Sequence, residues 1–340
     1  MTVHERILAL GSMTVALCLM SSCMASPNIL FIMSDDHATN AISCYGGTFK
    51  DLLPTPNIDR LAAEGVRLDN CLVTNSICTP SRACILTGKY GHKNGVLTLH
   101  DDMDRNQDNV AKHLQHAGYQ TAIIGKWHLH TEPSGFDYYN VLPGQGRYND
   151  PILKEKGDTW HAGNRGGKSY TGYTTDVITD YSLKWLQERD KTKPFFLMCH
   201  HKAPHGLWEY PKRHEHLFDG ITIPEPASLW EDKSHRSEGS RQYGRDILSL
   251  SDRMNALKRG KPWPTGRLDT TAMTDTQKIK TAYQKYLKDY LRVVAAIDEN
   301  VGRMLAYLDE AGLTANTLVI YTSDQGMFLG EHSLYDKRWI

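Results

Sequence analysis

The sequence predicts a single large α/β domain built on a mostly parallel sheet with helices on both faces. Four short apolar runs, "NILFIM", "TAIIG", "FFLMC" and "TLVIYT", pass directly into charged or histidine-bearing residues, which is typical of buried parallel strands. Helical patterns alternate with these runs along the chain. Ligands of open α/β sheets bind beyond the carboxyl ends of the strands. We therefore expect the four polar segments to meet in space.

The helical patterns follow apolar spacings of three to four residues. They are expected at residues 56–64, 110–117, 176–188 and 278–311, and Gly312 ends the last of them. Residues 224–275 differ, because they contain few apolar runs and many Ser, Arg, Asp and Gly residues. We expect this segment to be a surface excursion that contributes to the rim of a substrate site.

The composition allows one sizeable core and excludes a general polyanion binder. Of the 340 residues, 40% are apolar. Lysine plus arginine and aspartate plus glutamate number 39 each, so the formal net charge is zero. Such a chain has no overall positive field for nucleic acid or an anionic membrane, and we expect no nucleic-acid partner. An anionic substrate must be bound by a local group of residues.

The first 25 residues are typical of a cleaved export signal. A weakly basic start precedes an apolar run over residues 7–20 and then "SSCMAS". The run is too short and too interrupted by Gly and Ser for a transmembrane span. We expect a periplasmic or extracellular protein whose mature domain covers residues 26–340. Because "LMSSC" also resembles a lipoprotein cleavage box, a lipid anchor at Cys23 is the alternative.

One of the remaining cysteines lies in an unusual setting. Five cysteines follow the export signal, and an odd number in an oxidising compartment requires an explanation. Taken alone, Cys78 is most simply a small buried hydrophobic residue. However, the stretch "CTPSRACILTG" places Pro80 and Arg82 close behind it. Pro80 and Ser81 fit a helix that begins at Cys78, and the helix N-terminus would favour an anion beside this cysteine.

The Cys-x-Pro-x-Arg sequence at Cys78 resembles the signature of the type I sulfatase family, in which the cysteine is oxidised to formylglycine. Other blocks that resemble the family occur in the family's order along the chain: "SDDH", "TPNIDRLAAEGV", "GKWH", "APH" and "SDQGMFLGEHSLYDKR". The last block most resembles polysaccharide and glycosaminoglycan sulfatases, including the N-acetylglucosamine-6-sulfatase group. The resemblance implies an alkaline-phosphatase-like sandwich over residues 28–340. Family members continue into a smaller C-terminal subdomain, which we expect to be missing here.

The resemblance also implies the reaction, the hydrolysis of a sulfate ester on a sulfated carbohydrate. A hydrated formylglycine derived from Cys78 would attack sulfur with one hydroxyl and release sulfate with the other. A formylglycine-generating enzyme is then an expected partner. Arg82 would hold the nucleophile, and Lys126 would bind the sulfate. The residues implied to be catalytic are Cys78, Arg82, Lys126, His128, His205 and Lys337.

The same resemblance implies one divalent metal ion that contacts the nucleophile at Cys78. Asp35 and Asp36 follow one strand, and Asp324 and Gln325 follow another. An Asp pair alone could equally be a solvated turn. Together, three carboxylates and an amide oxygen are hard ligands that suit Ca²⁺ better than Mg²⁺. Gln325 replaces the asparagine of many family members, and its carbonyl oxygen would preserve ligation.

Two other functions remain open from the sequence. A phosphoesterase or phosphonate hydrolase of the alkaline phosphatase superfamily would share the fold, although such enzymes usually use Ser or Thr and two metals with several histidines. A chain without its C-terminal part could instead be an inactive remnant that only binds carbohydrate. The motifs do not specify which sugar is bound or which hydroxyl carries the sulfate.

Overall fold

A computed structural model describes residues 26–160, 166–242 and 244–338. The expected export signal and the alternative lipid anchor at Cys23 lie outside the described residues. Within these ranges, no helix has the length and apolar character needed to cross a membrane. The cysteines of the described ranges are all free thiols.

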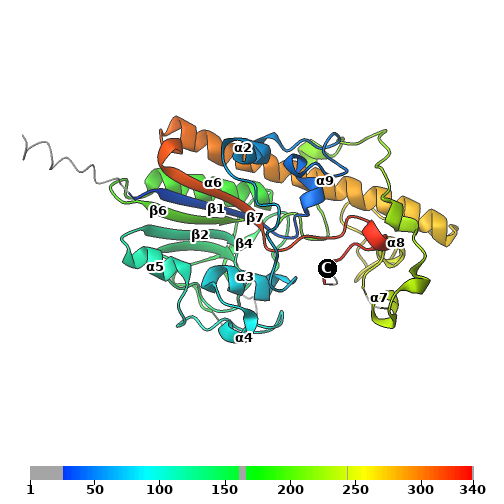
Figure 1. Cartoon of the computed structure of the whole chain (residues 1–340), viewed down its shortest axis with the longest axis horizontal. Coiled ribbons are helices and arrows are strands. Elements are labelled where there is room, and N and C mark those ends of the chain that lie inside the picture. Colours follow the sequence, from blue (N-terminus) through cyan, green and yellow to red (C-terminus); the bar gives the residue numbers. More distant parts are fainter. Residues whose placement is uncertain (1–25, 161–165, 243, 339–340) are drawn as a thin grey trace, which may run out of the picture.

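A seven-stranded sheet in the order β5-β4-β3-β2-β6-β1-β7 forms the centre of the molecule (Figure 1). Parallel pairing joins β3 (Tyr138–Leu142), β2 (Gln120–Lys126), β6 (Phe195–His200), β1 (Asn28–Ser34) and β7 (Thr317–Ser323). Antiparallel pairing adds β4 (Ile152–Glu155) and β5 (Lys168–Ser169) at one edge. The four apolar runs are therefore confirmed as parallel strands.

Helices cover both faces of the sheet, which confirms the predicted fold class (Figure 1). One face carries α2 (Pro56–Glu64), α6 (Thr174–Glu188) and the long α9 (Asp275–Glu310). The other carries α3 (Cys78–Thr87), α4 (Gly91–Asn94) and α5 (Val110–His116). A capping box between Thr274 and Gln277 begins α9. Short 3₁₀ turns lie at Thr39–Ala41, Ser43–Tyr45, Lys212–His214, Ala227–Trp230, Lys233–His235, Thr314–Asn316 and Glu331–Ser333.

Residues 224–275, which the sequence predicts to be a surface excursion, contain a helix that packs into the core. They contain α7 (Glu238–Gln242) and α8 (Ile247–Asn255), and α8 packs against α9. Ile247, Leu250 and Met254 are fully buried, because their spacing of three to four residues gives α8 one apolar face. An antiparallel bridge between Asp246 and Leu334 joins the segment to the chain that leads toward Lys337. This segment therefore lies beside the C-terminal residues of the chain.

Candidate active site

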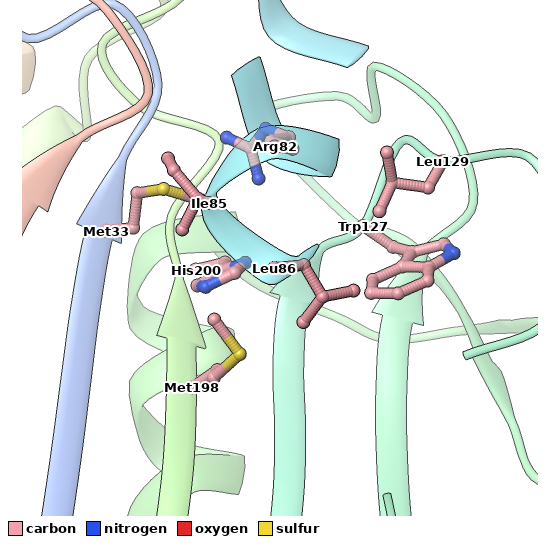
Figure 2. A pocket seen from close by; sticks show the side chains of 8 residues that line it. All are labelled: Met33, Arg82, Ile85, Leu86, Trp127, Leu129, Met198 and His200. Atoms are coloured by element: carbon pink, nitrogen blue, oxygen red, sulfur yellow. The ribbon is translucent and has the colours of Figure 1, made fainter. Parts of the chain in front are cut away.

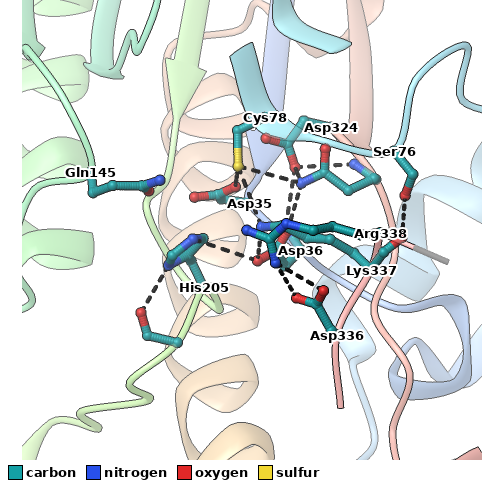
Figure 3. A network of polar contacts seen from close by, with 12 residues as sticks. Asp35, Asp36, Ser76, Cys78, Gln145, His205, Asp324, Asp336, Lys337 and Arg338 are labelled. Atoms are coloured by element: carbon teal, nitrogen blue, oxygen red, sulfur yellow. Dashed lines mark hydrogen bonds and ion pairs between the residues drawn. The ribbon is translucent and has the colours of Figure 1, made fainter. Parts of the chain in front are cut away.

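The carboxyl ends of the parallel strands bring charged side chains to one place, as the sequence predicted (Figure 3). Asp35 and Asp36 follow β1, Lys126 ends β2, and Asp324 follows β7. These four side chains are almost completely buried. His205 follows β6 and keeps 22% of its side chain exposed. The strand-end residues therefore form one buried ionic group with an opening at the histidine.

Cys78 is the first residue of α3 and points into this group. Its Sγ lies 3.4 Å from Asp35 Oδ1, 3.3 Å from Lys337 Nζ and 3.8 Å from Gln325 Nε2. Burial, and next the negative charge of Asp35, raise the pKa of the Cys78 thiol to about 12. The unmodified thiol is therefore protonated at neutral pH and is a poor nucleophile.

Arg82 lies one turn after Cys78 on α3 and ties the helix to two strands. Its Nε donates to Asp324 Oδ2 at 2.9 Å, and its Nη1 donates to the carbonyl oxygen of Lys126 at 2.8 Å. Lys126 Nζ in turn contacts Asp35 Oδ2 and donates to Gln145 Oε1 at 2.8 Å. These contacts place two fixed cations close to Cys78.

Lys337 supplies a third cation from the C-terminal side. Its Nζ donates to both carboxylate oxygens of Asp36 at 2.6 Å, and Ser76 Oγ donates to its carbonyl oxygen at 2.8 Å. Burial lowers the pKa of Lys337, but Asp36 and the neighbouring anions more than offset burial and raise that pKa above its ordinary value. Lys337 is therefore charged while it lies beside Cys78.

His205 faces the group with one ring nitrogen. Its Nδ1 lies 2.8 Å from the carbonyl oxygen of Gly206, so this nitrogen carries a proton. Its Nε2 lies 3.9 Å from Asp36 Oδ2. Burial holds the pKa of His205 well below its ordinary value, although the charge of Asp35 opposes this effect. The ring nitrogen that can exchange a proton with a ligand is therefore Nε2.

The three carboxylates have the placement of a metal-binding group. Single oxygens of Asp35, Asp36 and Asp324 all lie within 4.8 Å of one another. Burial raises the pKa of Asp324 to about 8, and the charge of Asp35 adds to the effect. Burial also raises the pKa of Asp36, despite the charge of Lys337. A cation among these oxygens would reduce their mutual repulsion, so the carboxylates fit a divalent ion.

Gln325 fits that ion after a half-turn of its amide. Its Nε2 donates to Asp36 Oδ1 at 2.5 Å and to Asp324 Oδ1 at 2.7 Å, because carboxylates can only accept. Its Oε1 is buried and has no hydrogen-bond partner within the described part of the chain. The sequence predicts Oε1 as the ligand, and rotation about the last side-chain bond exchanges the two atoms without changing the shape of the amide.

His128 is a buried residue that follows β2. The residue is only 5% exposed, has a φ of 54°, and its ring centroid is 5.6 Å from that of His130. Burial, and next the charge of Lys126, lower the pKa of His128 to about 2. Its Nδ1 is buried without a hydrogen-bond partner among the residues described. The geometry therefore places a neutral His128 next to the ionic group.

A cavity of about 150 Å³ opens beside the ionic group. His205 and Lys337 line it together with residues that sequence reasoning missed, namely Gln145, Arg245, Arg253 and Trp263. Gln145 could have been found, because "NVLPGQG" repeats the pattern of an apolar run that passes into polar residues. The other three lie in the segment 224–275, where no periodic pattern pointed to them.

A second cavity is too small for a substrate. It measures about 10 Å³ and lies where α3 meets the strand ends, between Arg82, His200 and apolar side chains such as Trp127 (Figure 2). This volume holds at most about one water molecule. The larger cavity is therefore the candidate substrate site.

A family model described as Sulfatase matches residues 27–339. The chain belongs to the sulfatase family. The chain is 43% identical over 348 residues to the N-acetylglucosamine-6-O-sulfatase of Bacteroides thetaiotaomicron. That similarity covers 92% of the chain and 60% of the relative, so the chain spans about three fifths of the length of this curated relative.

Solved structures agree with the family. One, of a protein in complex with its substrate D-glucosamine-2-N,6-O-disulfate, superposes on the chain with a TM-score of 0.82 and 41% identity, over 92% of the chain and 68% of that protein. The phosphonate monoester hydrolase of Agrobacterium radiobacter superposes with a TM-score of 0.61 and 20% identity, over 91% of the chain and 64% of that enzyme. The second match is evidence of fold alone. Together they confirm the alkaline-phosphatase-like fold predicted from the sequence.

Proposed function

We propose that the chain hydrolyses the sulfate ester of a sulfated sugar, with the residue derived from Cys78 as its nucleophile. The observation that carries the proposal is the position of Cys78 Sγ, 3.4 Å from Asp35 and 3.3 Å from Lys337, at the start of α3. The N-acetylglucosamine-6-O-sulfatase relative and the disulfated glucosamine bound by the solved neighbour support a glucosamine carrying a 6-O-sulfate as the substrate class.

Formylglycine at position 78 agrees with the environment of that residue. A formylglycine-generating enzyme would convert Cys78, and the hydrated aldehyde would supply one hydroxyl for attack and a second for release of sulfate. The buried thiol, with its raised pKa of about 12, offers no comparable nucleophile. Lys337 Nζ and the N-terminus of α3 would stabilise negative charge at this position.

One Ca²⁺, with Mg²⁺ as the less suitable alternative, would be held by Asp35, Asp36, Asp324, Gln325 and the residue at position 78. The bound ion would lower the pKa of the nucleophile and polarise the sulfate. The three carboxylates already face three cations, since Asp35 contacts Lys126, Asp36 contacts Lys337 and Asp324 contacts Arg82. A divalent ion would therefore make the site net positive, which suits an anionic ester.

The remaining residues would have separate roles around the sulfate ester. We propose that Lys126 binds the sulfate oxygens and that His128 contacts the nucleophile. His205 lines the cavity, and its Nε2 would give a proton to the departing sugar oxygen after the bound anionic ester has raised the pKa of the ring and Nε2 has taken up a proton. We further propose that the mature domain covers residues 26–340 and is exported to the periplasm or the cell exterior, with lipid attachment at Cys23 as the variant form.

Sulfate release from N-acetylglucosamine 6-sulfate tests the proposal. The chain, produced together with a formylglycine-generating enzyme, should release sulfate, and Cys78→Ala should abolish the activity because the nucleophile is removed. Cys71→Ala is the matched control, since Cys71 is exposed and outside the site. Hydrolysis of the 6-phosphate in preference to the 6-sulfate would favour a phosphoesterase instead. Binding of the sugar without turnover by the folded, matured chain would favour the inactive remnant.

A further inference from the structure

We propose that Arg245 and Arg253 bind a second anionic group of the sugar, separate from the sulfate that is cleaved. Both side chains line the cavity that reaches His205 and Lys337. The inference rests on the proposed function for the orientation of the substrate and adds to it a basis for substrate selection. Neither arginine belongs to the ionic group around Cys78.

The charges that line the cavity are unevenly compensated. Asp36 accepts from Lys337 at 2.6 Å, and Asp336 accepts from Arg338 at 2.6 and 2.8 Å. These two acids are therefore neutralised by cations that line the same cavity. Arg245 and Arg253 remain as positive charges on a wall whose described residues contribute no further carboxylate.

Neither arginine has an acidic partner within the described ranges. No hydrogen bond or ion pair engages the guanidinium of Arg245 among those residues, and Arg253 Nη1 donates to the neutral hydroxyl of Tyr335 at 2.5 Å. The acids next to them in the sequence are occupied elsewhere. Asp246 caps the N-terminus of α8, and Asp252 lies 3.9 Å from Lys278 Nζ. An anion that enters the cavity would meet two guanidinium groups without displacing an existing carboxylate.

Aromatic rings lie beside the Arg253 guanidinium, and Tyr335 accepts from one of its N–H groups. Its Cζ lies 5.9 Å from the ring centroid of Trp263 and 5.8 Å from that of Tyr335. A guanidinium has five N–H donors, and only one is committed to Tyr335. The others match the paired oxygens of a sulfate or a carboxylate. Trp263 also gives the cavity an apolar surface against which a sugar ring can pack.

The backbone fixes the arginines relative to the reaction centre. The amide of Tyr335 donates to the carbonyl oxygen of Arg245 at 2.9 Å, and Tyr335 precedes Lys337 by two residues. Arg253 lies on α8, which packs against α9. A substrate whose sulfate lies at Lys337 therefore meets the arginines at a constant separation. Such a fixed spacing favours sugars with a second anion at a matching position.

Two kinds of second anion share the required chemistry. One is a sulfate on another position of the same sugar, such as the 2-amino group. The other is the carboxylate of a uronic acid joined to that sugar. Three substrates distinguish them: glucosamine 2-N,6-O-disulfate, N-acetylglucosamine 6-sulfate, and a disaccharide of a uronic acid with N-acetylglucosamine 6-sulfate. The preferred doubly anionic substrate identifies the anion.

The test compares kcat/KM for each doubly anionic substrate with that for N-acetylglucosamine 6-sulfate. We expect the matured chain to prefer one doubly anionic substrate by about 10-fold or more, the effect of a charge-assisted hydrogen bond. Arg245→Gln and Arg253→Gln should each lower this preference by about 10-fold, and Arg253→Lys should retain part of it. Arg259→Gln is the matched control, because Arg259 is exposed and outside the cavity.

A binding measurement separates this inference from the proposed function. Calorimetry would compare N-acetylglucosamine with glucosamine 2-N-sulfate and with an unsulfated uronic acid disaccharide of N-acetylglucosamine. Tighter binding of one anionic sugar that both Gln variants weaken supports the arginine site, even if the chain releases no sulfate. Equal affinity for the three sugars, together with a kcat/KM preference that the variants leave unchanged, overturns it. Equal losses on singly and doubly anionic substrates also overturn it, because they indicate a structural role.

Discussion

His205 and Lys337 line the same cavity but have different chemistry. The Nδ1 of His205 is committed to the carbonyl oxygen of Gly206 at 2.8 Å, which leaves Nε2 for a ligand. If Nε2 protonates the leaving oxygen, His205→Ala should slow a sugar sulfate about 100-fold more than an activated aryl sulfate, whose phenolate needs little protonation. Steady-state kinetics with both substrates checks this. Equal losses on the two would show that His205 binds sulfate instead.

Replacement of Lys337 should change the kinetics differently from replacement of His205. Its Nζ is a fixed charge, 3.3 Å from Cys78 Sγ and 2.6 Å from Asp36, and it lies close to where the sulfuryl group would react. Lys337→Ala should therefore depress kcat/KM for sugar and aryl sulfates to a similar degree, because both develop the same charge on sulfate. The same pair of assays measures it. A loss confined to the sugar sulfate would transfer the role of proton donor from His205 to Lys337.

Among the elements, β2 and β6 approach each other closely at Gly125, which has a φ of 104°. A Cβ at this position would collide with the carbonyl oxygen of His200. Gly125→Ala should therefore lower the free energy of unfolding by more than about 2 kcal/mol and disturb Lys126, the next residue. Chemical denaturation checks the change. Gly118→Ala is the control, since Gly118 has a φ of 89° and no atom within 4 Å of a Cβ.

If the two glycine variants lose equal stability, backbone strain alone accounts for the effect and close strand packing does not. In that case Lys126 would not depend on the approach of β2 to β6.

The elements that the sequence predicted are those with a strong local signal. The runs that became β1, β2, β6 and β7 are apolar throughout their centres, and each passes into charged residues. β4 was missed because "ILKE" is short and half polar, and it pairs antiparallel at an edge. The sequence singles out motif residues such as Cys78 and Asp324 as candidates because each follows or begins an identifiable element.

The residues that line the cavity could not be predicted from the sequence in the same way. Arg253 and Tyr335 are 82 positions apart, and their contact depends on the docking of α8 against α9 and on the bridge to Leu334. The spacing of Ile247, Leu250 and Met254 gives α8 an apolar face but does not specify the element against which that face packs. The buried face of α8 is visible only as three apolar residues among many polar ones.

At the scale of the whole molecule, the proposed metal ion joins distant parts of the chain. Its ligands follow β1 and β7 and begin α3, so a bound ion would stabilise the folded chain over the unfolded one. At a Ca²⁺ concentration 100 times the Kd, we expect a gain of about 2.7 kcal/mol. Thermal denaturation with Ca²⁺ or with a chelator checks this. Chelation should also abolish sulfate release.

Asp324→Ala should remove the response to Ca²⁺, because one anionic ligand is lost and the remaining carboxylates still repel each other. Asp309→Ala is a suitable control, since Asp309 is exposed and pairs with Arg60 and Thr314, away from the carboxylates of the site. Equal denaturation midpoints in Ca²⁺ and chelator for the native chain would contradict a metal at this site.

The central claim is that position 78 carries formylglycine and that this group performs sulfate ester hydrolysis. Peptide mass spectrometry of the peptide that contains position 78, taken from a preparation that releases sulfate, tests it most directly. We predict that the Cys78 thiol is replaced by an aldehyde or its hydrate, and that the converted fraction rises in proportion to activity. An unmodified Cys78 thiol throughout an active preparation would contradict the account.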